Sequence, residues 1–127
     1  MLYRASCHCG AVEVEVEAPE RVVCSECNCS ICAKGGFLHL ILPKSRCRLV
    51  RGADSLTTYI FNTGVAKHTF CRVCGIKPFY VPRSNPDGYS ANVRCLDPQP
   101  REVVVQSFDG EHWEEHGASL ADLSREP

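Results

Sequence analysis

The chain has 127 residues, enough for one domain that buries its own core. Its formal net charge is −1, and this balance argues against the basic face that DNA- and RNA-binding proteins usually carry. No apolar run approaches the ~20 residues of a membrane span, and the first residues lack the apolar core of a secretion signal. We therefore expect a single cytoplasmic domain, residues 1–127, with neither nucleic-acid nor membrane partners.

Short stretches of alternating or β-branched residues predict β-strands along most of the chain. Residues 11–17 alternate strictly, so Val12, Val14 and Val16 should face the core while the glutamates between them face solvent. Further strands are predicted, in chain order, at residues 36–42, 46–50, 56–61, 65–70, 77–82, 89–95 and 103–108.

The later part of the chain adds an edge strand, a turn and a helix. Prolines near both ends of 77–82 predict an edge strand, and the cluster RSNPDG at 83–88 predicts a turn. From Glu111 onward the pattern predicts a short helix anchored on the sheet by Trp113. Its exposed face should carry His112, Glu114, Glu115 and His116. Many short strands with turn signals every ~8–12 residues are typical of antiparallel all-β domains.

Ten cysteines are clustered rather than spread. In a reducing compartment such clusters are more often metal ligands or redox groups than disulfides. Two pairs, Cys7–Cys9 and Cys71–Cys74, each precede a glycine, which is typical of zinc knuckles. Four thiolates complete a tetrahedral zinc shell, so this ion would be structural and its binding energy would contribute to folding. The alternatives are two unrelated reduced pairs, or a redox pair at Cys71 and Cys74. His8 should point to solvent.

A second group, Cys27, Cys29 and Cys32, offers only three thiols. Catalytic zinc sites keep three protein ligands and leave the fourth position to water or substrate. Three thiolates suit a soft incoming sulfur, and a thiol bound there becomes a nucleophile. The alternative is that Cys24 closes this shell and makes the second ion structural. Of the remaining cysteines, Cys47 is expected to be a small buried hydrophobe and Cys95 is left open.

The motifs C-H-C-G-A-V, C-N-C-S-I-C and H-T-F-C-x-x-C-G occur in this order along the chain. Together they resemble the glutathione-dependent formaldehyde-activating enzyme family, over nearly the whole chain. The stretches TTYIFNTGVAKHTFC, FYVPRSNPDG and CLD are closest to the centromere protein V branch of that family.

The resemblance implies an Mss4-like all-β fold (a β-tent) of antiparallel sheets, with zinc knuckles and two zinc ions per chain. It places the structural zinc on the residues Cys7, Cys9, Cys71 and Cys74, and the catalytic zinc on Cys27, Cys29 and Cys32. Cys24 has no counterpart in the pattern. The implied activity joins formaldehyde to glutathione to give S-hydroxymethylglutathione, which is carbon–sulfur lyase chemistry, with the glutathione sulfur taking part at the second zinc.

Two further residues are candidates for the site. His68 could line the pocket as an acid–base group or hydrogen-bond a zinc thiolate, or it could be a structural histidine. Arg83 could hold a carboxylate such as that of glutathione, or could lie in a merely solvated turn with Tyr80, Ser84 and Asn85. His39 shares a strand face with Phe37 and Ile41 and is expected to be a half-buried structural residue.

Three hypotheses follow from these residues. The leading one is a zinc-dependent carbon–sulfur lyase-like enzyme acting on an aldehyde adduct of glutathione or another small thiol. The second is a binding module without catalysis, in which both zinc ions are structural. The third is a redox or metal-buffer protein.

Overall fold

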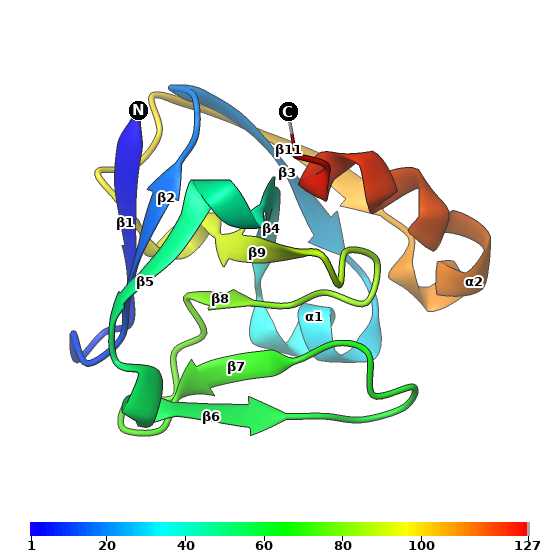
Figure 1. The fold of residues 1–127 in the computed structure, drawn as a ribbon. Helices are drawn as coiled ribbons and strands as arrows, with labels where there is room; N and C mark the ends of the chain where they lie inside the picture. Colours follow the sequence, from blue (N-terminus) through cyan, green and yellow to red (C-terminus); the bar gives the residue numbers. More distant parts are fainter. Residues whose placement is uncertain (127) are drawn as a thin grey trace.

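A computed structural model describes residues 1–126, and within them eleven β-strands form three sheets, joined by short helical segments (Figure 1). This agrees with the predicted all-β, Mss4-like class with a short C-terminal helix. The first sheet has the strand order β10 (Leu96–Asp97), β1 (Leu2–Ser6), β2 (Glu13–Glu17) and β5 (Cys47–Arg51).

The second sheet has five strands and the third has two. In the five-stranded sheet the order is β11 (Glu102–Phe108), β3 (Arg21–Cys27), β4 (Leu38–Pro43), β9 (Gly88–Asn92) and β8 (Phe79–Tyr80), so β8 lies at an edge as the prolines predict. In the two-stranded sheet, β6 (Leu56–Tyr59) pairs with β7 (His68–Cys71).

The core lies between the four-stranded and five-stranded sheets. Val12, Val14 and Val16 are at most 1% exposed, as the alternation on β2 predicts. They join one apolar cluster with residues from the other sheet, among them Leu40 of β4 and Val22 of β3. Burial of this apolar area supplies most of the favourable free energy of folding.

Several predictions of local structure were wrong. The strands β1 and β3 were not predicted, nor was the helix α1 (Ser30–Gly35), which lies directly after β3. Strand β11 pairs with β3 in parallel, not antiparallel. The paired residues lie about 80 positions apart in the sequence, as Phe108 does from Cys27. A local sequence pattern carries no information on such a distant pair.

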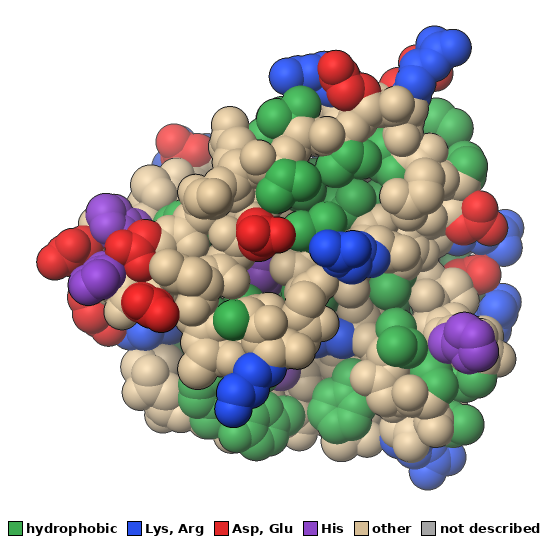
Figure 2. Space-filling view, turned by 180° about the vertical axis from the view of Figure 1, so that it is seen from behind, with side chains coloured by type: hydrophobic (Ala, Val, Ile, Leu, Met, Phe, Trp, Pro, Cys, Tyr) green, Lys and Arg blue, Asp and Glu red, His purple; other side chains and the backbone are tan. Residues whose placement is uncertain are grey.

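The C-terminal helix α2 is short, Trp113–His116, and continues in 3₁₀ turns over Gly117–Ser124. Its predicted polar face is exposed, and acidic and histidine side chains gather at this end of the molecule (Figure 2). None of the helices in residues 1–126 is long and apolar enough to cross a membrane.

One alternative was that the turn at 83–88 is merely solvated, and the structure contradicts it. Asn85 is fully buried, and its Nδ2 donates to the Leu120 carbonyl and to Ser124 Oγ, each at 2.8 Å. These bonds tie the C-terminal 3₁₀ turns to the edge of the five-stranded sheet. Trp113, predicted to anchor the helix on the sheet, stacks instead beneath the Arg83 guanidinium, which is 3.7 Å from the ring centroid.

Candidate metal centres and pocket

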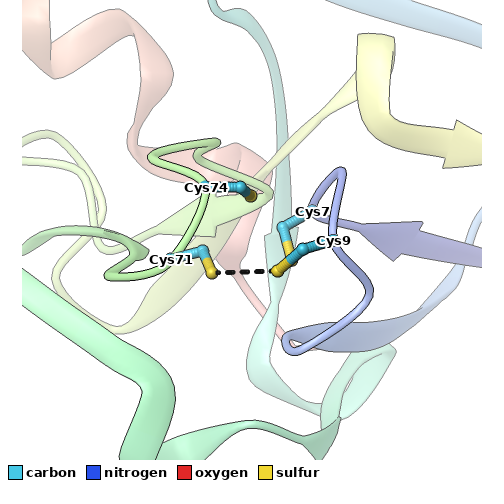
Figure 3. Close-up of side chains that lie close together, drawn as sticks. All are labelled: Cys7, Cys9, Cys71 and Cys74. Atoms are coloured by element: carbon cyan, nitrogen blue, oxygen red, sulfur yellow. Dashed lines mark hydrogen bonds between the residues drawn. The ribbon is translucent and has the colours of Figure 1, made fainter.

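The structure brings together the four thiols of the two predicted knuckles (Figure 3). The Sγ atoms of Cys7, Cys9, Cys71 and Cys74 all lie within 4.8 Å of one another. The Cys7–Cys9 and Cys9–Cys71 sulfur pairs are 3.7 and 3.6 Å apart. Sulfurs bound to one zinc at ~2.3 Å form a tetrahedron with edges of ~3.8 Å, so this group has the size of a closed four-thiol metal site.

Tight turns hold these thiols in place. Cys7 directly follows β1 and Cys71 ends β7, so the two turns come from different sheets. Gly75 has a φ of 80°, a backbone conformation that costs other residues free energy. Backbone N–H groups point at two of the sulfurs, from Val12 to Cys7 at 3.3 Å and from Val73 to Cys71 at 3.4 Å. Such N–H groups stabilise thiolates.

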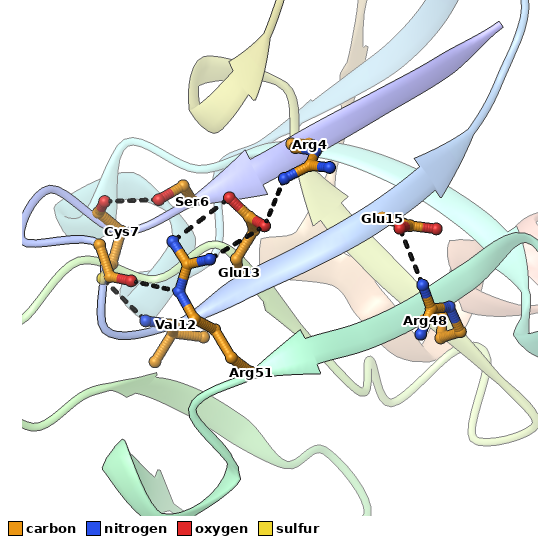
Figure 4. Close-up of polar contacts among 9 residues, drawn as sticks. Arg4, Ser6, Cys7, Val12, Glu13, Glu15, Arg48 and Arg51 are labelled. Atoms are coloured by element: carbon orange, nitrogen blue, oxygen red, sulfur yellow. Dashed lines mark hydrogen bonds and ion pairs between the residues drawn. The ribbon is translucent and has the colours of Figure 1, made fainter.

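A buried carboxylate braces the first knuckle (Figure 4). Glu13 was predicted to face solvent, but it is only 7% exposed. Arg4 Nη1 donates to it at 3.0 Å, and Arg51 donates through Nη1 and Nη2 at 3.3 and 3.4 Å. Arg51 also donates from Nε to the Gly10 carbonyl at 2.9 Å. The two guanidinium groups replace the water that a buried carboxylate loses, and Arg51 thereby links β5 to the knuckle turn.

The structure also brings together the second group, Cys27, Cys29 and Cys32, which we call the trio. Its three Sγ atoms lie within 4.8 Å of one another. Cys27 ends β3, Cys29 is the residue before α1, and Cys32 lies on the first turn of that helix. Gly36 caps the C-terminus of helix α1, with a left-handed φ of 65° and an N–H that donates to the Cys32 carbonyl at 3.0 Å.

Cys24 does not complete this group. It is 1% exposed and belongs to the hydrophobic core together with Val22. Side chains on a strand alternate between faces, so Cys24 and Cys27 lie on opposite faces of β3. Across residues 1–126, the structure places no fourth cysteine, histidine or carboxylate with the trio. The alternative of a second shell closed by Cys24 is therefore not supported.

A loop from the far end of the chain closes one side of the trio. Asn28 donates from Nδ2 to Asp109 Oδ1 at 3.1 Å and accepts from the Glu111 N–H at 2.9 Å. These bonds hold Gly110 against the thiols, where an added Cβ would lie 2.2 Å from Cys27 Sγ. The backbone thus packs against Cys27 more closely than any side chain would allow.

The remaining side of the trio opens on a pocket of about 600 Å³. Both His39 and His68 line it, as do Tyr80 and Phe61. The rings of Phe61, His68 and Tyr80 stack in sequence, with centroids 5.4 and 5.0 Å apart. Such an apolar, aromatic wall with a few polar groups is typical of small-molecule sites.

Polar contacts behind this wall fix both histidines. Lys77 Nζ lies 2.7 Å from His68 Nδ1 and 3.8 Å from the centroid of the Tyr80 ring. His39 Nδ1 lies 3.0 Å from the Tyr80 hydroxyl and 3.3 Å from the Ser90 hydroxyl. His39 was expected to be half-buried and structural, but it is 5% exposed and lines the pocket. The reason is that β4 is buried on both faces.

Burial and the neighbouring charges set the protonation of these groups. Burial lowers the pKa of His39 and that of His68 to about 4, and the Lys77 charge adds to both shifts. Burial also lowers the pKa of Lys77, to about 8. At neutral pH the histidines are therefore neutral and Lys77 carries a charge. Within the trio, hydrogen bonds from Cys27 and Cys32 lower the pKa of Cys29 to about 2.

The predicted residue Arg83 also lines the pocket. Its Nη2 donates to Glu114 Oε1 at 2.6 Å, and its side chain is 23% exposed. Arg83 is thus held at the pocket wall by the carboxylate of Glu114, a residue of the same chain. The sequence had suggested that Arg83 holds the carboxylate of a ligand.

Both thiol groups could hold a metal ion. Their donors are soft sulfurs, which favour zinc among the common divalent ions. In the first group, backbone N–H groups are directed at the sulfurs of Cys7 and Cys71, and such hydrogen bonds stabilise metal-bound thiolates.

Sequence reasoning missed Lys77, Asn28 and Gly110 as parts of the site. Their signals existed but were weak: Asn28 lies between two of the cysteines, and Lys77 lies three residues after Cys74. Cys47 is buried as predicted, at 6% exposed. Cys95 is half-buried and its Sγ lies 3.9 Å from the Lys77 carbonyl.

Comparisons with known proteins identify a family, a related sequence and a similar solved structure. A family model described as glutathione-dependent formaldehyde-activating enzyme matches residues 2–113. A protein of Halomonas elongata, provisionally named as a glutathione-dependent formaldehyde-activating enzyme, is 33% identical over 82 residues. That match covers 58% of this chain and 52% of the relative, so the chain matches only about half the length of that curated protein.

A solved structure is also similar. The crystal structure of a Rhodobacter sphaeroides protein, determined in a structural genomics programme, is 43% identical in sequence. The superposition has a TM-score of 0.69 and covers 81% of this chain and 99% of that one.

Proposed function

Because this chain belongs to the glutathione-dependent formaldehyde-activating enzyme family, we propose that it is a zinc-dependent carbon–sulfur lyase-type enzyme. It makes or cleaves the carbon–sulfur bond of an aldehyde adduct of glutathione, such as S-hydroxymethylglutathione, or of another small thiol. One observation carries the proposal: three thiols that could hold a metal ion lie in the wall of a pocket. Three ligands leave one coordination position for a substrate.

The two cysteine groups take different roles in this proposal. Cys7, Cys9, Cys71 and Cys74 hold a structural zinc, and Cys27, Cys29 and Cys32 hold the catalytic one. An ion bound by the trio supplies a Lewis acid with one free position, which suits a soft sulfur ligand and favours the thiolate form of a thiol. The protein itself shapes the pocket, limits access of water and positions the carbonyl group.

His68 and Arg83 have proposed roles at opposite ends of the bound molecule. His68 lines the pocket beside the stacked rings of Phe61 and Tyr80 and is the first candidate for handling the proton of the reaction. Arg83 would exchange its single contact with Glu114 for a carboxylate of glutathione, which a guanidinium can bind in a two-pronged geometry.

The proposed branch of the family rests on sequence motifs, and the proposed compartment rests on the state of the cysteines. The motifs TTYIFNTGVAKHTFC and FYVPRSNPDG place the chain, in our proposal, in the centromere protein V branch of the family. All ten cysteines are free thiols in the structure, which suits a reducing compartment. We therefore propose a cytoplasmic enzyme with small-molecule partners, a thiol and an aldehyde.

Cobalt replacement tests the proposal directly. Protein loaded with Co²⁺ is titrated with glutathione up to millimolar concentration, and its visible spectrum is recorded. We expect the bands of one of the two ions to change, because a fourth sulfur joins the trio. A spectrum that stays unchanged contradicts the proposed function.

A metal count separates this enzyme from a module with two structural ions. The variant Cys24→Ala should keep both ions, while Cys29→Ala should lose one. If Cys24→Ala releases the second ion, the shell is closed by protein and the module hypothesis is correct.

A further inference from the structure

Each of the two pocket histidines has one ring nitrogen engaged by the protein and one without a partner. For His68, Nδ1 is 2.7 Å from Lys77 Nζ. For His39, Nδ1 is shared by the hydroxyls of Tyr80 and Ser90. No protein atom in the part of the chain that the structure describes hydrogen-bonds Nε2 of either histidine.

The partners of Nδ1 decide which nitrogen carries the proton. A lysine ammonium only donates, so His68 Nδ1 accepts and the ring proton sits on Nε2. Burial lowers the pKa of Lys77 only to about 8, so the ammonium form dominates at neutral pH.

His39 reaches the same state by a different route. Tyr80 and Ser90 are 5% and 0% exposed, and each has a hydroxyl proton to donate. His39 Nδ1 lies within hydrogen-bond distance of both hydroxyls. The Tyr80 hydroxyl also contacts the Cys32 sulfur, whereas among residues 1–126 the Ser90 hydroxyl has His39 Nδ1 as its side-chain partner. When Nδ1 accepts the Ser90 proton, the ring proton of His39 must also sit on Nε2.

His39 Nε2 is therefore a donor without an acceptor, and the described residues contain no other buried side-chain nitrogen or oxygen in that condition. Buried polar atoms in native structures almost always have a partner. His39 is 95% buried, because its side chain is only 5% exposed, and it lines the pocket that holds the cysteine trio. The missing acceptor is then expected from a molecule in that pocket.

We propose that His39 and His68 form a pair of Nε2–H donors that binds the oxygen atom of the aldehyde carbon beside Cys27, Cys29 and Cys32. This inference rests on the proposed function and deepens it: both histidines are catalytic residues, and Lys77 is a positioning residue that fixes the proton of His68. Two fixed donors select a substrate whose reacting carbon carries an oxygen acceptor, an aldehyde or its hydroxyalkyl thioether.

The reaction balances with both histidines protonated on Nε2 before and after it. The thiol sulfur forms a bond to the carbonyl carbon, and the π electron pair of the C=O bond moves to the oxygen. The negative charge that develops there is stabilised by the two N–H groups. The proton that the thiol loses ends on this oxygen, so the histidines finish as they began. The reverse reaction breaks the carbon–sulfur bond and returns the proton to sulfur.

Histidine nitrogen NMR on the zinc-loaded full chain tests the tautomers. With ¹⁵N-labelled histidine, we expect His39 and His68 to show a protonated Nε2 and an unprotonated Nδ1, with His8 at the surface as an exposed reference. A protonated Nδ1 in either pocket histidine overturns the proposal. In Lys77→Met the preference of His68 should be lost. Lys67→Met, in which the lost ammonium group donates to the Gly64 carbonyl, should leave it unchanged.

Ligand titrations test the oxygen and separate this inference from the proposed function. Glutathione alone should change the cobalt spectrum but leave both Nε2–H signals in place. Glutathione with formaldehyde should shift both signals, and S-methylglutathione, which lacks the oxygen, should not. If the cobalt spectrum responds but the Nε2–H signals never respond to formaldehyde, the donor pair is wrong while the proposed function stands. If the cobalt spectrum does not respond to glutathione, the proposed function is wrong.

Variants of His39 test catalysis. The rate of exchange between S-hydroxymethylglutathione and its components, followed by NMR exchange, should fall ~10²-fold or more in His39→Leu, the loss typical of one oxyanion donor. His39→Gln keeps an N–H donor at a similar reach and should restore part of that rate. Equal rates in the wild type and a folded, metal-loaded His39→Leu variant overturn the catalytic role.

Discussion

Gly110 lies so close to Cys27 that a Cβ built on the glycine would be 2.2 Å from the Cys27 sulfur. Residues 83 positions apart in sequence, Asn28 and Glu111, hold the two segments together through a 2.9 Å hydrogen bond. The position of the trio, Cys27, Cys29 and Cys32, therefore depends on the loop that follows β11, the strand that pairs in parallel with β3.

This contact predicts a selective loss of one metal ion. In Gly110→Ala the methyl group needs space that Cys27 Sγ and Cys29 Cβ occupy, so the trio must open. We expect metal affinity at this site to fall ~10-fold or more, the range typical of residues that support metal ligands. Competition with a chromophoric chelator measures it.

Gly35→Ala is the matched control, because nothing lies within 4 Å of the added Cβ. Its metal content should match the wild type. Full occupancy of both sites in Gly110→Ala would contradict the idea that Gly110 supports the trio.

The two thiol groups should differ in what their loss does to the fold. Cys71 is fully buried at the end of β7, and its sulfur lies 3.6 Å from that of Cys9 in the turn after β1, so an ion bound there would link two sheets. We expect Cys71→Ser to lose one ion and at least about 3 kcal/mol of unfolding free energy, since structural zinc contributes ~10 kcal/mol or more in small zinc domains. Chemical denaturation with a metal assay measures both.

Cys29→Ser should also lose one ion but unfold at a denaturant concentration much nearer that of the wild type. The trio lies at the wall of a pocket and is contributed by one segment, β3 and the start of α1. Equal destabilisation by the two substitutions would mean that both ions are structural.

The parts of the fold that the sequence predicts are those with a local pattern. Val12, Val14 and Val16 alternate on β2, and the structure buries them as expected. Strand β3 has only Val22 and Cys24 as fully buried residues, and helix α1 has only Cys32 as a buried one. Such short elements have too few apolar repeats to be predicted from the sequence, because their pairing with distant strands is what stabilises them.

The same reasoning explains what was found of the site. Cysteine spacing indicates both thiol groups, since closely spaced cysteines are typical of ligands for one ion. His39 was missed because all of β4 is buried, so period-two alternation cannot tell its pocket face from its core face. The contact of Lys77 with His68 depends on how β8 follows β7, which no short motif records.

The buried Glu13 predicts that two exposed arginines differ in importance. Arg51 bonds Glu13 and the Gly10 carbonyl, so Arg51→Met leaves a buried carboxylate with Arg4 as its remaining partner. We expect a loss of about 2 kcal/mol in unfolding free energy, within the range for a buried group deprived of a partner. Arg48→Met removes only a pair with Glu15, whose side chain is 22% exposed, and should cost less than about 0.5 kcal/mol. Similar losses in the two variants would show that the buried network adds nothing.

The depressed pKa of His39 predicts a pH dependence of stability. The folded-state pKa is about 4 and the ordinary histidine pKa is 6.5, so between these values the unfolded chain takes up a proton that the folded chain does not. Stability from this group is complete above pH ~6.5 and is lost as the pH falls toward ~4, by about 2 kcal/mol between pH 7 and 5. His39→Gln removes the titration. Because release of metal in acid affects both proteins, the difference between their unfolding free energies isolates the histidine, and the variant should gain about 2 kcal/mol relative to wild type over this interval. A difference independent of pH would mean that His39 titrates as an exposed histidine does.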